Sequence, residues 1–133
     1  MHQNYSKDMS KTKTYVDTFP LDVLTEKLGN YLQGRHNCKV LYADDPNHYP
    51  SWCFIQTRRH GLIKQTNEKC IDITIQGTRK ECKITTDSGE WGKNTFDETK
   101  PLISYKGILA KEEGKLGSLI TQSLIWEFLD KNT

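Results

Sequence analysis

The chain has no long apolar run. None of its 133 residues belongs to a stretch of the roughly 18 consecutive apolar residues that a membrane-spanning helix needs. The polar first residues, MHQNYSKDMSKTKTYVD, have no apolar core of the kind found in signal peptides. These two absences predict a cytoplasmic protein without a membrane span.

Neither sign of charge dominates. The chain has 19 Lys and Arg against 17 Asp and Glu, which gives a formal net charge of +2. A dedicated binder of duplex DNA usually carries a larger and more clustered basic excess, so bulk charge indicates solubility and nothing more.

Closely spaced cysteine pairs are also missing. The four cysteines stand at positions 38, 53, 70 and 82 with no CxxC pair, whereas structural zinc sites usually draw on ligands at such short spacing. Cys53 and Cys82 alternate in step with isoleucines, so they are expected to be buried small hydrophobic residues. The sequence therefore predicts reduced thiols and no metal or other cofactor.

The hydrophobic fraction is low, at 35%, and the mean hydropathy is −0.74. Part of the chain is therefore expected to be solvated. Residues 1–16 are polar and aperiodic, which predicts a disordered tail. Residues 17–133 are enough for one domain with a core.

Two segments have the apolar spacing of amphipathic helices. The first begins after Pro20, a residue suited to the first turn of a helix, and ends near Gly34. The second covers residues 116–129 and has a wide apolar stripe that needs a sheet to pack against. The apolar residues of the two stripes are Leu21, Leu24, Leu28, Tyr31 and Leu32, and Leu116, Leu119, Ile120, Leu124, Ile125, Trp126, Phe128 and Leu129.

Between these helices the pattern changes to the alternation of strands. Ile71, Ile73 and Ile75 alternate with polar residues, and after Gly77 a return strand follows around Ile84. Residues 38–43 and 52–57 predict two further strands, and residues 102–110 an optional edge strand. The expected fold is α+β, a four- to five-stranded antiparallel meander with the N-terminal and C-terminal helices packed on one face.

Residues 52–131 carry a pattern found in a family. A strand with Gln56 and Arg58 precedes a hairpin with Gly77, then Gly89-Glu90-Trp91-Gly92 and a helix ending in IWEFL. This pattern resembles a small bacterial domain of unknown function that is sometimes fused to a zinc ribbon. The chain lacks the zinc ribbon and the glycine-rich apolar segment of that family. The resemblance implies a helix-flanked antiparallel sheet, and no activity.

One constellation could carry catalysis. Asp72, followed by Glu81 and Lys83, matches the D…ExK arrangement with which metal-dependent nucleases bind Mg²⁺ and place a lysine near the attacking water. Glu26 on the first helix could be an outer ligand. The competing interpretation is that Asp72 belongs to a solvated face opposite the three isoleucines.

Basic residues mark a second hypothesis. Arg58 and Arg59 follow one strand, in what is predicted to be a turn, and Arg79 and Lys80 occupy another turn. If both turns lie at one end of the sheet, and if Trp52, Phe54 or Trp91 is exposed, single-stranded nucleic acid could bind by stacking and phosphate contacts. The simpler interpretation is that turns are basic because they are wet, and that tryptophans fill the core.

The favoured prediction is a binding or interaction module without a catalytic residue. Its expected binding surface consists of Arg58, Arg59, Trp52 and Trp91. The expected partner is another protein, or a second copy bound through the terminal helix. Single-stranded nucleic acid and the Asp72, Glu81, Lys83 nuclease are the alternatives.

Overall fold

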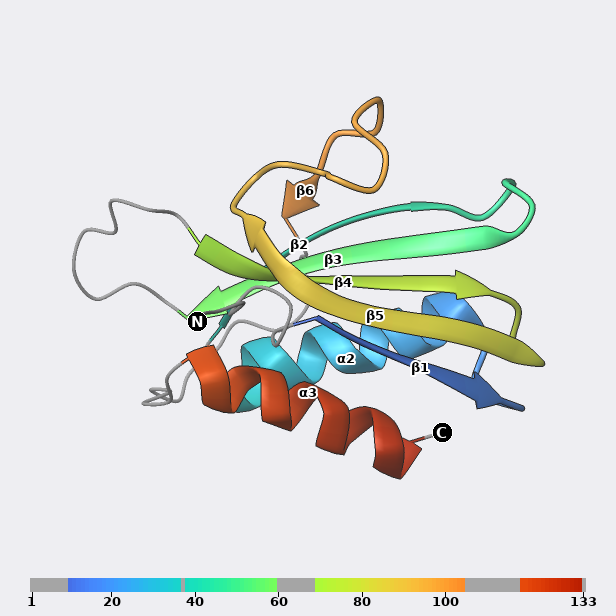
Figure 1. Cartoon of the computed structure of the whole chain (residues 1–133), viewed down its shortest axis with the longest axis horizontal. Helices are drawn as coiled ribbons and strands as arrows, with labels where there is room; N and C mark the ends of the chain where they lie inside the picture. Colours follow the sequence, from blue (N-terminus) through green and yellow to red (C-terminus); the bar gives the residue numbers. More distant parts are fainter. Residues whose placement is uncertain (1–9, 37, 60–68, 105–117, 133) are drawn as a thin grey trace, which may run out of the picture.

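The structure is a computed structural model that describes residues 10–36, 38–59, 69–104 and 118–132. Its elements, in chain order, are β1 (Lys11–Val16), α2 (Leu21–His36), β2 (Cys38–Asp45), β3 (Ser51–Arg59), β4 (Lys69–Gly77), β5 (Glu81–Glu90), β6 (Ile103–Ser104) and α3 (Ser118–Asn132). The fold is α+β (Figure 1).

The strands form one antiparallel sheet in the order β1-β5-β4-β3-β2-β6. Strands β2 to β5 are the predicted meander. β1 adds to the β5 edge and the two-residue β6 adds to β2, so the sheet has six strands where four or five were expected. At the β4–β5 turn Gly77 has a φ of 120°, a conformation that glycine adopts without a steric penalty.

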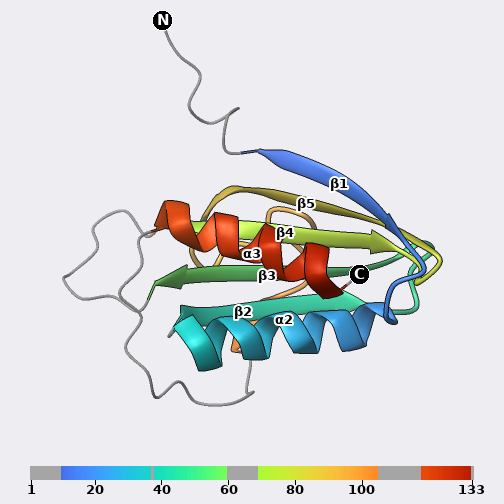
Figure 2. The ribbon, with the colours of Figure 1, turned by 90° about the horizontal axis from the view of Figure 1, so that it is seen from below.

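Both helices lie on one face of the sheet, called here the helix face (Figures 1 and 2). The isoleucines of β4 point to this face and meet the leucine stripe of α2 and the described apolar residues of α3. The resulting core contains Leu24, Leu28, Leu32, Ile55, Ile71, Ile73, Ile75, Ile84, Ile125 and Leu129. The opposite face, called the outer face, is partly covered by the segment that connects β5 to β6 (Figure 1).

Three predictions about the elements need correction. Residues 11–16 were expected in a disordered tail, but they form β1, because their backbone completes the edge of β5. Arg58 and Arg59 were expected in a turn, but they continue β3 opposite Lys39 and Cys38. The optional edge strand exists only as β6, and residues 105–110 lie outside the described residues. Within the described part of the chain, no helix is long and apolar enough to cross a membrane.

Candidate functional site

A buried glutamine holds the chain that follows β5 onto the outer face. The Gln56 side chain is fully buried on β3. Its Nε2 atom donates to Asp72 Oδ1 at 2.8 Å, to Glu90 O at 2.8 Å and to Lys93 O at 3.0 Å. Its Oε1 atom accepts the Gly92 N–H at 2.8 Å. Gln56 thereby fixes the backbone on both sides of Trp91.

Asp72 lies beside Gln56 on β4 and is also buried. Besides the Gln56 amide, its carboxylate accepts the Thr95 hydroxyl at 3.1 Å and the Cys70 thiol at 3.5 Å. Burial raises the pKa of Asp72, and the three hydrogen bonds only partly oppose this shift because each of them favours the charged form. The carboxylate therefore acts as an internal anchor for the segment after β5.

The turn held by Gln56 brings two of the predicted binding residues together. The guanidinium carbon of Arg58 lies 4.6 Å from the centroid of the Trp91 ring, a cation–π contact. Both side chains are half-buried. Arg58 and Trp91 are 33 positions apart in the chain, so it is the alignment of β3 with the end of β5 that brings them together.

Further basic residues meet at the same end of the sheet. In the strand register Lys39 lies opposite Arg58, Cys38 opposite Arg59, and Lys69 opposite Glu90. Lys93 follows two residues after Trp91 and lies 4.0 Å from Glu90 in an exposed ion pair, which contributes little to stability. We call this region the basic end, and it comprises Lys39, Arg58, Arg59, Lys69, Trp91 and Lys93. Among the described side chains, Arg58 contacts Trp91, and Lys39 and Lys93 are exposed at the same end of the sheet.

Trp52 does not belong to this surface. It is buried, with 2% of its side chain exposed, and packs with Ala43, Phe54 and Leu102 in a second small core on the outer face. The Phe96 ring covers it at a centroid distance of 4.9 Å. The prediction that Trp52 contacts a ligand is therefore not met, because the segment after β5 lies over it. Phe54 is buried in the same way.

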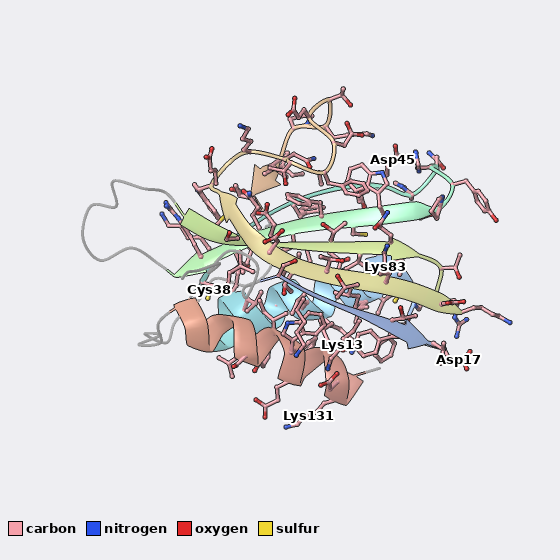
Figure 3. All side chains as sticks on the ribbon, viewed as in Figure 1. Lys13, Asp17, Cys38, Asp45, Lys83 and Lys131 are labelled. Atoms are coloured by element: carbon pink, nitrogen blue, oxygen red, sulfur yellow. The ribbon has the colours of Figure 1, made fainter. Side chains whose placement is uncertain are left out.

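The two basic pairs that the sequence placed in turns lie at opposite ends of the sheet. Arg79 and Lys80 follow Gly77, which pairs with Ser51 at the start of β3, whereas Arg58 and Arg59 end that strand. Figure 3 places Cys38 at the end occupied by Arg59, and Asp17 and Asp45 at the other. The positive patch forms without Arg79 and Lys80.

The residues of the nuclease hypothesis are not assembled. Asp72 lies opposite Asp87 in the register, and Glu81 begins β5 six residues away. At about 3.3 Å per residue this separates the two carboxylates by roughly 20 Å along the sheet. Lys83 lies opposite Gln76, on the outer face. In the described ranges, no group of three or more His, Cys, Asp or Glu side chains could hold a metal ion.

The burial predicted for Cys53 and Cys82 is confirmed. Cys38 and Cys70 are buried as well, and none of the four cysteines forms a disulfide. Burial raises the pKa of Cys53 to about 11, and it also raises the pKa of Cys70 and Cys82. Thiolates are therefore disfavoured, and these cysteines behave as small hydrophobic residues.

The described apolar residues of the terminal helix pack in the interior. Ile125, Trp126 and Leu129 are buried against the sheet, and the Phe128 ring stacks on Tyr31 of α2 at 4.6 Å. Over residues 123–131, whose side chains are described, α3 has no exposed large hydrophobic residue. A docking stripe on the terminal helix thus has no support in this part of the chain.

Lys39, Lys69 and Lys93 were missed from the sequence. Each is an isolated lysine in its own segment, and only the register of four strands shows that they share an end. Gln56 was noted as part of a pattern, but its function as a clamp required knowledge of the turn at Trp91. A polar residue at an otherwise apolar strand position was the one available signal.

Comparisons of the chain with protein-family models, with curated proteins and with solved structures find no match. The resemblance of residues 52–131 to a small bacterial domain therefore stays a prediction. The function has to be argued from the chain's own residues.

Proposed function

We propose that the chain is a non-catalytic binding module that holds single-stranded nucleic acid at the basic end of its sheet. The observation that carries this proposal is the contact of Arg58 with Trp91, on a turn held in place by Gln56, with the exposed Lys39 and Lys93 at the same end of the sheet. Nonspecific binders of single strands combine a positive surface that follows the phosphates with aromatic rings on which bases stack.

The contacts around Trp91 support this use. The indole is half-exposed, and Arg58 covers one part of it, which leaves another part for a nucleobase. Lys39, opposite Arg58 in the register, and Lys93, two residues after Trp91, are exposed and can neutralise phosphates. Because three hydrogen bonds of Gln56 already fix the turn, binding orders few additional backbone torsions.

The carboxylates support binding without hydrolysis. Two-metal or one-metal phosphodiester cleavage needs carboxylates that converge on one cation. Asp72 is enclosed by donors from Gln56, Thr95 and Cys70, and Glu81 lies at the opposite end of the sheet. The free, buried thiols accord with a reducing, cytoplasmic setting for such a module.

The test is titration of the protein with a single-stranded oligothymidylate of about ten nucleotides, within the usual site size of such folds, followed by fluorescence anisotropy over a salt series. Each phosphate contact contributes a slope of about −0.7 in log K against log salt. Lys39→Ala with Lys93→Ala should weaken binding and reduce this slope by about 1.4. Trp91→Ala should cost about 1–3 kcal/mol, the usual contribution of one stacked base.

A matched control removes the same charge from the other end of the sheet. Arg79→Ala with Lys80→Ala changes two exposed residues of the β4–β5 turn and should leave affinity and slope as in the native chain. Equal losses in the two double variants would show that only bulk charge matters and would refute a site at the basic end. Absence of binding at low salt would refute the proposed ligand.

A further inference from the structure

The outer edge of β1 is a second surface, independent of the basic end. β1 is the last strand on its side of the sheet, and Figure 2 shows its free side next to no other strand. Within the described residues, β1 pairs with β5 alone. An unpaired edge offers backbone donors and acceptors to any extended segment that can align with it.

The register identifies which residues offer those groups. The Asp17 N–H donates to Lys80 O at 3.0 Å, in line with the pairing of Tyr15 with Cys82. Because hydrogen-bonded positions recur at every second residue of an antiparallel pair, Lys11, Lys13 and Tyr15 direct their backbone groups toward β5. The N–H and C=O groups of Thr12, Thr14 and Val16 therefore point away from the sheet.

The side chains beside this edge define its charge. Lys11 and Lys13 project to the helix face, where their Nζ atoms lie 5.1 and 5.3 Å from the Trp126 ring centroid. Lys13 also forms an ion pair with Asp130 at 3.1 Å. Over the described part of the chain, no carboxylate lies within ion-pair distance of Lys11, so the edge keeps a positive charge.

We propose that the β1 edge binds an extended acidic segment of a partner protein by strand addition. The backbone of that segment pairs with Thr12, Thr14 and Val16. Its residues opposite Lys11 and Lys13 lie on the helix face and carry carboxylates, since opposite charges on directly paired positions stabilise a sheet. The backbone contacts give affinity, and the two lysines select for acidic side chains at alternating positions.

The same lysines disfavour a second copy as the occupant. An antiparallel pairing of two β1 strands about a two-fold axis would bring the Lys11 and Lys13 residues of both copies to one face of a joint sheet. Lysines on edge strands are a common means of preventing this kind of association. The charge that opposes a second copy is the charge that attracts an acidic strand.

The experiment uses a synthetic peptide of about eight residues, the length of an ordinary strand, in which glutamate alternates with threonine. Amide hydrogen exchange is measured by NMR with and without the peptide. In the free protein the amides of Lys13 and Tyr15 should already be protected, and those of Thr12, Thr14 and Val16 should exchange fast. Saturating peptide should protect these three amides, and a peptide with lysine in place of glutamate should not.

Two variants with a matched control complete the test. Thr14→Pro removes an outward N–H without removing a bond to β5, and it should lower peptide affinity about tenfold or more. Thr14→Val keeps the backbone and should bind as the native chain does. Lys11→Glu leaves the backbone intact and should reverse the preference toward the lysine peptide, so the test does not depend on Thr14→Pro folding normally.

Three results would overturn the proposal. One is continued fast exchange of Thr12, Thr14 and Val16 at saturating glutamate peptide. Another is equal protection by both peptides, since charge would then select nothing. The third is protection that appears in the protein alone as its concentration rises, because the occupant would then be a second copy.

Discussion

Gly89 lies against the carboxylate of Asp72, so close that a methyl group on Gly89 would overlap the carboxylate carbon and both of its oxygens. Gly89 belongs to β5 and is paired with Cys70, two positions before Asp72 on β4. The absence of a side chain at Gly89 is what lets Asp72 lie flat across the strand and reach Gln56 and Thr95.

Gly89→Ala should therefore destabilise the protein, by about 1–3 kcal/mol as for other overpacked buried sites. The measurement is urea unfolding of the variant and the native chain. Gly34→Ala is the matched control, because a methyl at this position of α2 meets no atom within 4 Å. In a helix, replacing glycine with alanine should increase the free energy of unfolding by about 0.5–1 kcal/mol. Equal effects of the two substitutions would contradict the contact between Gly89 and Asp72.

Asp72→Asn should stabilise the protein at neutral and alkaline pH. Burial raises the pKa of Asp72 in the folded state above its ordinary value of 3.8. A group of this kind contributes stability that is fully present below the unfolded pKa and is lost as pH rises through the folded pKa. The asparagine variant does not lose this stability as the pH rises. Its melting temperature should therefore exceed that of the native chain at pH values above the folded-state pKa of Asp72, and the two melting temperatures should converge in acid.

The control for this pH dependence is Asp87→Asn. Asp87 lies opposite Asp72 on β5, is exposed, and raises the pKa of Asp72 through its charge. Cys70, which donates a hydrogen bond to Asp72, also lies in the field of Arg58 and Glu90. Asp87→Asn should reduce the pH dependence only slightly. If the native chain and Asp72→Asn showed the same dependence of stability on pH, Asp72 would not titrate as its burial requires.

Gln56→Leu should release the turn that carries Trp91. The substitution removes the partner of the Gly92 N–H and of the carbonyls of Glu90 and Lys93, which are only partly buried, at a cost of about 0.5–1.5 kcal/mol for each hydrogen bond lost. The Gly92 amide should exchange much faster by NMR. Gln76→Leu, a substitution on β4 that faces the same outer side of the sheet, should change stability by less than about 0.5 kcal/mol. Unchanged exchange at Gly92 would rule out the clamp.

Saturating Mn²⁺ should leave the melting temperature unchanged. A metal that binds the folded state at 100 times its dissociation constant stabilises it by about 2.7 kcal/mol, which thermal denaturation detects readily. The separation of Asp72 from Glu81 by roughly 20 Å removes the reason to expect such a site. A shift that disappears in Asp72→Ala would restore the nuclease hypothesis.

The elements that have one buried face could be predicted from the periodicity of the sequence. The alternation of Ile71, Ile73 and Ile75 and the leucine stripe of α2 identified the meander and the helix, because each period reflects one buried face. Strand β1 could not be predicted from the sequence. Its residues KTKTYV have no apolar alternation, since an edge strand with threonines on one face and lysines on the other gains its place from backbone pairing with β5.

The candidate site was predictable only in part. Arg58 and Trp91 could be named because basic and aromatic residues stand out in a sequence. Which lysines lie near them depends on the pairing of four strands, and no local sequence pattern predicts such pairing. The burial of Trp52 agrees with the simpler interpretation that tryptophans fill the core, but its cover by Phe96 could not be predicted, because the polar segment that carries Phe96 has no periodicity of its own.

Because β1 pairs with β5, it cannot complete its pairing during biosynthesis until β5 has been made. Thr12 and Thr85, whose hydroxyls lie 3.1 Å apart, are separated by 73 positions in the chain. At the usual 5–20 residues per second, a ribosome needs roughly 4–15 seconds to add the second threonine after the first. Of the described strands, β1 is thus the one that waits longest for its first neighbour, and for those seconds both of its edges are open to other nascent chains and to chaperones.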